Sequence, residues 1–297
     1  MKCPACLLGL PPSDLATLAE HLHERARGSD SDHVRWLNQN LSRAQLERPE
    51  LEDRLRAFFD LAGGNVAQWI EARFVARFFG PRPHPFVVAL QHPSRSTLLG
   101  YVIEHQHFLR QWVRSCAYIM ARTDSAEVVR YELDNLSTEF GGLVPGTVSH
   151  YELLLRMGES LGMDRDTILA FEPLPATQAG IRGWNAIAST APWVEALAAM
   201  HSLELIAHRD LVRRGASLHY FDPTILEGGS IPEAAKAFLR EGYEADVGHS
   251  EEALALVNSA ARDPEAIQGV QAAFLRSIDL FDDYLRARLE RGIRLEG

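Results

Sequence analysis

Hydrophobic residues recur at helical intervals along almost the whole chain, and this pattern constrains the fold more than any other feature. Beyond Asp263-Pro264, apolar side chains return every three or four positions, at Ile267, Val270, Phe274, Ile278, Phe281 and Leu285. The alternating pattern of β-strands is not evident, and β-branched residues are sparse. The sequence therefore predicts an all-α fold, a helical bundle.

Breaks in this periodicity predict the order of the helices. Short helices are expected near 13–26, 31–45, 49–61 and 65–78, and longer ones over about 97–121, 125–139, 149–162 and 191–214, from about 231, and from 264. The proline-rich stretch 80–96 is expected to be an extended connection. We place a domain boundary there, between an N-terminal helical extension (1–90) and a bundle (91–297).

Capping signals indicate where two of these helices begin. Ser149 with Glu152, and Ser230 with Glu233, match the S-x-x-E capping box. Pro232 near the first turn of the second helix agrees with a helix start.

The charge balance limits the classes of partner. The chain of 297 residues has 46% apolar and 24% charged residues and a net charge of −10. Nucleic acids and anionic membranes attract concentrated positive charge, which this chain lacks, so neither is the expected partner. No apolar run approaches membrane-spanning length. We expect a cytoplasmic protein that acts on a small molecule, and a homodimer is the candidate assembly.

The three cysteines predict no disulfide framework. Cys3-Pro-Ala-Cys6 has metal-binding or redox spacing, but the sequence has no second C-x-x-C motif to complete a zinc site. The favoured interpretation is a mobile, reduced N-terminal tail. Cys116 is expected to be a small buried residue of a helix.

Several acids and histidines are predicted to meet inside the bundle. If helices 97–121 and 125–139 are antiparallel, Glu104 lies about 28 Å and Glu139 about 24 Å from their connection, so both reach a similar level. His150 begins the next helix, Glu204 is surrounded by apolar residues, and Asp246 and His249 share one helix face. Carboxylates and imidazoles that project inward from facing helices typically build transition-metal sites.

Each of these residues also has a structural interpretation. Glu104 could lie on a solvated helix face, and Glu204 could pair with Arg209 or Arg213. Asp246 and His249 could form only an intrahelical hydrogen bond. A cation would remove the repulsion of several carboxylates at one level, and this consideration favours the metal site.

Three stretches together resemble a known superfamily. NLSTEFGGLVPGTVSHYELLLRMGESLGM, MHSLEL and FLREGYEADVGHSEEAL are similar to sequences of the heme-oxygenase-like metal oxidases and oxygenases, whose relatives include the TenA and PqqC folds and the Chlamydia protein associating with death domains. The resemblance covers about residues 97–290. It implies a seven-helix up-and-down bundle that holds one or two Fe(II) ions without haem.

The resemblance also implies a ligand set. The positions that match ligands are Glu104, Glu139, His150, Glu204, Asp246 and His249. The family usually reads His-x3-Asp-x2-His on the late helix, and here Gly242 replaces the first histidine. Either the second iron is weak or absent, or His208 or His201 supplies the missing imidazole, or the metal chemistry is lost.

The resemblance implies an oxidase or oxygenase that uses O2 on a small molecule in a specialised biosynthetic pathway. Relatives act on amino acids, fatty acids and aromatic acids, and candidate partners for a substrate carboxylate are Arg110, Arg122, Arg130 and Arg213. Two alternatives are kept. One is a cofactorless oxidase like PqqC, and the other is a non-catalytic binding or interaction protein with a degenerate metal site.

Overall fold

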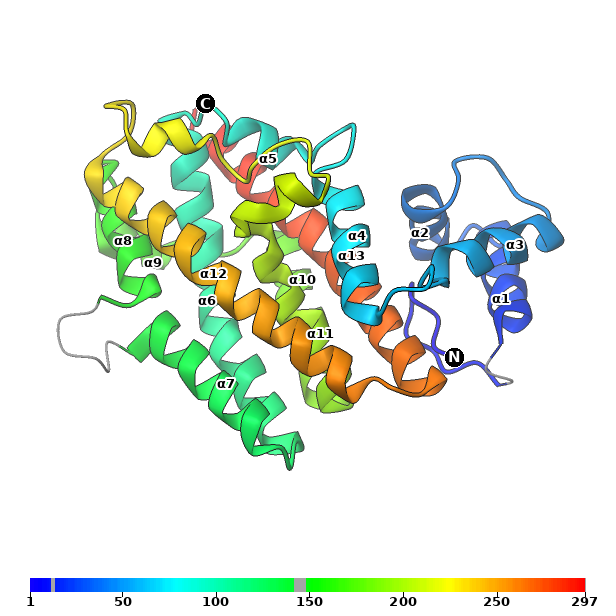
Figure 1. Ribbon diagram of the computed structural model, residues 1–297. Helices are drawn as coiled ribbons and strands as arrows, with labels where there is room; N and C mark the ends of the chain where they lie inside the picture. Colours follow the sequence, from blue (N-terminus) through cyan, green and yellow to red (C-terminus); the bar gives the residue numbers. More distant parts are fainter. Residues whose placement is uncertain (12–13, 142–147, 297) are drawn as a thin grey trace.

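The computed structural model describes residues 1–11, 14–141 and 148–296, apart from the side chains of 244–246 (Figure 1). Within these residues every named element is a helix, and the one β-bridge joins Lys2 to Gly9. The predicted all-α fold is confirmed. None of the helices in the described ranges is both long and apolar enough to cross a membrane.

Two long antiparallel helices, α6 (Arg95–Arg122) and α13 (Pro264–Arg294), form the centre of the bundle. Gly100 allows their close approach, because a Cβ atom there would collide with the backbone of Arg288 and Gly292. Further along, the ring of Phe108 stacks on that of Tyr284 with centroids 5.2 Å apart. Glycine and aromatic contacts together fix the crossing of the two helices.

Other helices surround this pair. They are α7 (Ala126–Leu136), α8 (His150–Ser160), α9 (Arg165–Ala170), α10 (Pro175–Thr190), α11 (Trp193–His201) and α12 (Glu233–Ala260). In Figure 1, α12 runs across the front of the bundle and α10 and α11 lie behind it. Trp184 of α10 is fully buried, and its indole N–H donates to Ser277 of α13 at 3.0 Å.

Two irregular segments interrupt the regular helices. A π-helical turn, η1 (Ser137–Gly141), continues α7. The helix expected over 191–214 ends at His201 and is followed by the 3₁₀ segments η2 (Ser202–Ala207) and η3 (Arg209–Arg214). A further 3₁₀ turn, η4 (Pro223–Leu226), precedes α12. Such tight or wide turns re-aim side chains and are frequent at functional sites.

The first half of the N-terminal region forms a small module. It contains α1 (Leu15–Arg27), α2 (Ser31–Asn40) and α3 (Arg48–Phe59), drawn in blue in Figure 1. Leu18, Leu22, Trp36 and Leu55 are buried in its core. The next helix, α4 (Val66–Phe78), lies against the bundle, where Phe74 and Phe78 contact Phe281 of α13.

One expectation about a connecting segment is wrong, and one helix was not predicted. The proline-rich stretch 80–96 contains a short helix, α5 (Pro85–Ala89), because proline suits a first helical position and His84 caps it by accepting the Phe86 N–H at 3.2 Å. Helix α10 was not predicted, since Gly180 and Gly183 lower its propensity. In the structure Gly183 leaves space for the side chain of Leu280.

Capping explains most of the helix starts. Ser94 accepts the Thr97 N–H at 3.1 Å, Asp263 accepts the Ala266 N–H at 2.9 Å, and Ser149 accepts the Glu152 N–H at 3.3 Å. The second predicted capping box does not form. Helix α12 instead begins after Pro232, without a side-chain cap.

Candidate metal centre and substrate cavity

A cavity of about 60 Å³ lies inside the bundle, between α6, α8, α12 and α13. Its wall is mostly aromatic and aliphatic. Charged or imidazole groups also line it, and these belong to His105, Glu139, His150, Glu204 and Arg288. An apolar cavity with a few converging polar groups is the usual form of a small-molecule site.

Glu139 and His150 form a buried pair in this wall. The wide turn η1 carries Glu139, and His150 is the first residue of α8. His150 Nδ1 lies 3.2 Å from Glu139 Oε1. Burial alone would lower the pKa of His150, but the Glu139 carboxylate raises it above its ordinary value. The predicted convergence of these two residues is observed.

Glu204 lies in η2 and lines the same cavity. Its Oε1 accepts the Asn135 side-chain N–H at 2.9 Å, and Asn135 in turn accepts the Trp112 indole N–H at 2.5 Å. Glu204 does not pair with Arg209 or Arg213. Burial would raise its pKa, yet hydrogen bonds and charge from His201 lower it. Glu204 is therefore held as a carboxylate.

His201 lies between two buried carboxylates. Its Nε2 is 3.0 Å from Glu132 Oε1, and its Nδ1 is 3.3 Å from Glu204 Oε1. Burial acts to lower the pKa of His201, but these two acids raise it to about 10. Glu132 was not predicted as a site residue. It lies in the middle of α7, and only the contact with α11 identifies it.

Helix α12 contributes one wall of the cavity through Gly242. His249 does not line the cavity. Its Nδ1 lies 3.5 Å from the side-chain nitrogen of Asn135, which in turn contacts Glu204. The backbone at Asp246 belongs to α12, but the Asp246 side chain lies outside the described residues.

Glu104 and His208 lie apart from this group. Glu104 accepts a hydrogen bond from Arg291 at 2.7 Å and others from Leu174 N and Thr177 Oγ1, so its carboxylate faces α13 and the start of α10. The height of Glu104 on α6 was estimated without knowing which face turns inward. His208 lies 3.3 Å from Glu251 and caps η3, so it does not supply the missing imidazole at the cavity.

The chemistry of the donor set fits a metal ion. Three residues that line the cavity each have a buried donor atom without a hydrogen-bond partner among the described residues, namely Glu139 Oε2, His150 Nε2 and Glu204 Oε2. Buried polar atoms are normally satisfied, so these atoms require a cation or ordered water. Carboxylate oxygens and imidazole nitrogens are ligands of Fe(II).

Arg288 places a positive charge at the same cavity. The side chain is 2% exposed. It donates to Tyr220 at 2.8 Å, to Tyr284 at 2.7 Å and to His105 Nδ1 at 2.8 Å, and its guanidinium lies 4.1 Å above the ring of Tyr101. No carboxylate in the described part of the chain pairs with it. A buried cation without a counter-ion favours an anionic ligand.

The arginines proposed from the sequence as carboxylate partners lie elsewhere. Arg122 donates to the carbonyls that end α10, and Arg213 is exposed beside Asp210. Arg110 donates to Gln106, one turn earlier on α6, and Arg130 does not line the cavity. Arg288 was not predicted as a site residue, because α13 ends in several arginines with the same local pattern.

A second cluster of metal-type donors lies in the N-terminal module. Single donor atoms of Cys3, Cys6, His21 and His33 all lie within 4.8 Å of one another. The expectation of a mobile tail is wrong for this segment, because Cys3 is fully buried and pairs by backbone hydrogen bonds with Leu7 and Leu8.

Comparisons with known proteins match both parts of the chain. Residues 69–291 match the model of the TENA/THI-4/PQQC family. Residues 2–60 match a model described as a C2H2 type zinc-finger, in one copy. No curated protein is significantly similar to this chain.

Solved structures with the same fold come from several bacteria. A domain of unknown function with a heme oxygenase-like fold from Shewanella denitrificans has a TM-score of 0.56 and 16% identity, over 86% of this chain and 97% of its own. A TenA family transcription regulator from Silicibacter sp. TM1040 has a TM-score of 0.58 and 14% identity, over 76% of this chain and 97% of its own. A CADD-like protein of unknown function from Nostoc punctiforme has a TM-score of 0.51 and 19% identity, over 82% of this chain and 96% of its own. The predicted heme-oxygenase-like fold is confirmed.

Proposed function

The chain belongs to the TENA/THI-4/PQQC family, and from this premise we propose that it is a non-haem iron, dioxygen-dependent oxidase or oxygenase. Its substrate would be a small organic acid of a specialised biosynthetic pathway. One observation carries the proposal: unpartnered carboxylate and imidazole atoms line a cavity that also contains the buried, unpaired cation of Arg288.

Glu139, His150 and Glu204 are the proposed iron-holding residues within the described part of the chain. All three line the cavity, and each has a buried donor atom without a partner. Asp246 and His249, from α12, also belong to the set that the family resemblance implies, whereas Glu104 of that set pairs with Arg291. Bound Fe(II) would supply the redox chemistry that activates dioxygen.

The residues behind Glu204 would orient it. Asn135 donates to one carboxylate oxygen and His201 holds the same atom from the other side, so the second oxygen is left available. Groups of this kind fix the direction of a metal ligand and tune its basicity. Glu132 balances the charge of His201 at 3.0 Å.

Arg288 would bind the carboxylate of the substrate. Its guanidinium keeps Nε without a hydrogen-bond partner, and Tyr220, Tyr284 and His105 hold the rest of the fork. Arginine suits this role because its planar fork matches a carboxylate. The aromatic wall, including Phe108 and Phe238, would pack on the apolar part of the substrate and exclude water.

Iron content and oxygen consumption test this proposal. Protein loaded anaerobically with Fe(II) is expected to retain iron after desalting and to consume O2. Glu204→Gln should lose most of the iron. Glu104→Gln, which removes the charge of a carboxylate that faces Arg291, is the matched control and should retain it. Iron retained equally by both variants would remove Glu204 from the site.

Gly242 provides a gain-of-function test. The glycine lines the cavity, and the family resemblance implies a histidine at this position. Gly242→His is expected to raise the iron stoichiometry if the position faces the metal. An unchanged stoichiometry in a folded variant would separate position 242 from the metal centre.

The missing histidine also favours a second candidate function, a cofactorless oxidase. In that case the iron-free protein would still consume O2 with its substrate. A protein that neither binds iron nor consumes O2 would instead be a binding or interaction protein that keeps the cavity.

A further inference from the structure

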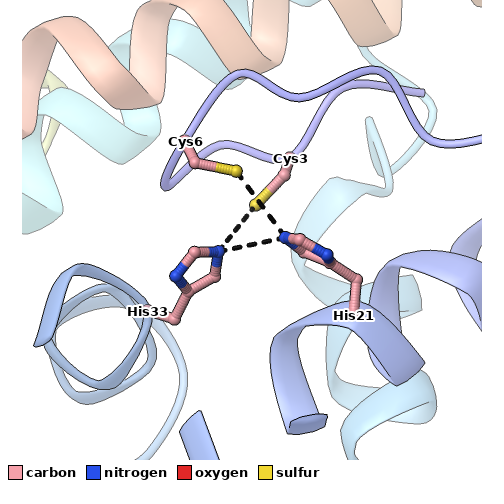
Figure 2. Close-up of side chains that lie close together, drawn as sticks. All are labelled: Cys3, Cys6, His21 and His33. Atoms are coloured by element: carbon pink, nitrogen blue, oxygen red, sulfur yellow. Dashed lines mark hydrogen bonds between the residues drawn. The ribbon is translucent and has the colours of Figure 1, made fainter. Parts of the chain in front are cut away.

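Four donor side chains of the N-terminal module point toward one another (Figure 2). Cys3 Sγ lies 3.6 Å from His33 Nε2, and Cys6 Sγ lies 3.6 Å from His21 Nε2. The two imidazole nitrogens are 3.0 Å apart. Around a tetrahedral zinc ion, with Zn–N of about 2.0 Å and Zn–S of about 2.3 Å, such atoms would be about 3.3–3.8 Å apart. The observed spacing is close to this range.

The surroundings of His33 independently indicate a metal ligand. Its other nitrogen, Nδ1, lies 2.7 Å from Asp30 Oδ1. A carboxylate in that place accepts the Nδ1–H and leaves the Nε2 lone pair directed at the two thiols and at His21. Histidines that bind metals usually have such a partner, which fixes the tautomer and the ring.

The backbone of the N-terminal loop is shaped for this cluster. Leu7 adopts φ +58°, a left-handed conformation that costs energy for leucine. Its N–H donates to Cys3 O at 2.7 Å, and the Cys3 N–H donates to Leu8 O at 2.9 Å. The tight loop turns both cysteines of Cys-Pro-Ala-Cys toward α1 and α2. Strain of this kind persists only where other contacts determine the conformation.

We infer that Cys3, Cys6, His21 and His33 bind one zinc ion, and that this ion fastens the N-terminal loop to α1 and α2. All four ligands come from the protein, which is typical of structural rather than catalytic zinc. The cluster is separate from the central cavity, which is lined by a different set of residues. The inference is therefore independent of the proposed oxidase function.

The spacing differs from that of a DNA-binding finger. Eleven residues separate His21 from His33, and the two histidines come from different helices, whereas finger histidines are usually three to five residues apart on one helix. Residues 2–60 also carry more acidic than basic side chains. The zinc therefore serves the protein's own architecture and not nucleic-acid binding.

The loop and α2 also connect the module to the bundle. Lys2 lies 2.6 Å from Glu195 of α11, and Arg35 donates to both oxygens of Asp283 of α13 at 2.5 and 2.6 Å. Because Lys2 is next to the ligand Cys3, the zinc positions one of these ion pairs directly. Loss of the ion is expected to loosen the module from α11 and α13.

Zinc stoichiometry and the spectrum of the cobalt derivative test the inference. Protein produced with zinc should contain one zinc per chain. After exchange with Co²⁺ it should show the visible absorption of a tetrahedral site and a thiolate charge-transfer band. Cys6→Ser is the preferred variant, because Cys6 is exposed and its change leaves the core intact. This variant should lose zinc and should give no thiolate charge-transfer band with Co²⁺, and cleavage by trypsin within residues 1–60 should accelerate.

Matched controls separate zinc ligation from general damage. His23→Asn changes a histidine of the same helix, two residues from His21, and should keep the zinc. Cys116→Ser changes the cysteine of the bundle and should keep it too. His33→Ala should lose zinc without lowering the iron content. The inference is overturned if wild-type protein holds no zinc and gives no thiolate band with Co²⁺, or if Cys6→Ser and His33→Ala bind zinc like wild type.

Discussion

Arg288 Nη2 and His105 Nδ1 lie 2.8 Å apart in the wall of the central cavity. A guanidinium can only donate, so His105 accepts this hydrogen bond and carries its proton on Nε2. Burial, and then the charge of Arg288, lower the pKa of His105 well below its ordinary value. The imidazole is therefore neutral, and the positive charge of Arg288 stays available to an anion.

Arg288→Met should abolish the binding of a small aromatic acid. Benzoate is expected to raise the melting temperature of wild-type protein, and benzamide, which has the same shape without the charge, is not. The variant should respond to neither compound. Because the substitution removes an unpaired buried charge, the fold should survive it. Differential scanning fluorimetry measures these responses.

Arg213→Met is the matched control, since the Arg213 side chain is 83% exposed and does not line the cavity. It should keep the full response to benzoate. Equal stabilisation of wild type and Arg288→Met by benzoate would contradict carboxylate binding at Arg288.

Glu104→Gln should destabilise the fold. Glu104 is completely buried, and its partner Arg291 has a side chain only 11% exposed, so the substitution leaves a buried guanidinium without its counter-ion. The expected loss in the free energy of unfolding is about 2–4 kcal/mol. Denaturation with guanidinium chloride measures it. Glu290→Gln breaks an exposed pair with Arg294 on the same helix and should cost less than about 1 kcal/mol. Equal costs would refute the structural role of Glu104.

Which side of a helix faces the site could not be predicted from the sequence. Residue spacing placed Glu104 and Glu139 at similar heights, but Glu104 faces α10 and α13 because Thr177 and Arg291 attract it there. By contrast, Glu204 lies among apolar residues, and the alternative partners near it in the sequence were Arg209 and Arg213, with which it does not pair. Its burial was predictable because a short apolar helix leaves no solvated face.

Gly100→Ala and Gly248→Ala should have opposite effects on stability. A methyl group at Gly100 would collide with the backbone of α13, which cannot move cheaply, and we expect a loss of about 3 kcal/mol. At Gly248 no described atom outside the neighbouring backbone of α12 lies within 4 Å of the added Cβ, so alanine should stabilise α12 by about 0.5–1 kcal/mol. Thermal unfolding of the two variants measures both signs. A stabilised Gly100→Ala variant would show that α6 and α13 are not in close contact.

Stability should fall as the pH drops from 6.5 toward 4. Burial, and then Arg110, lower the pKa of His107 to about 4, while its Nε2 lies 3.0 Å from the Phe171 carbonyl. In this window the unfolded chain binds a proton that native His107 does not, so protonation favours unfolding. Since His107 is only partly buried, its share is on the order of 1–2 kcal/mol.

Urea denaturation at several pH values tests this dependence. His107→Gln keeps a hydrogen-bond donor but cannot titrate, so its stability should change less between pH 6.5 and 4 than that of wild type. His105 adds a decrease of the same sign in both proteins, because its pKa is also lowered. Identical slopes for variant and wild type would show that native His107 is protonated normally.

The two missed sites share a physical cause. Arg288 has the same local sequence context as the solvent-facing arginines of α13, and only the rings of Tyr101 and Tyr284 around it make it special. His21 and His33 come from two helices with no recognisable motif spacing, so Cys3 and Cys6 seemed to lack partners. Local rules gave the helix starts at Ser149 and Asp263, because a cap is a contact within four residues.

The wide turn η1 has a consequence for how this chain can vary. A helix advances by about 100° per residue, so one residue more or fewer between Ser137 and Gly141 would swing Glu139 off the cavity while leaving its chemical identity intact. The direction in which this carboxylate points therefore depends on the number of residues in the turn. Natural or engineered relatives should accept substitutions in that turn far more readily than deletions.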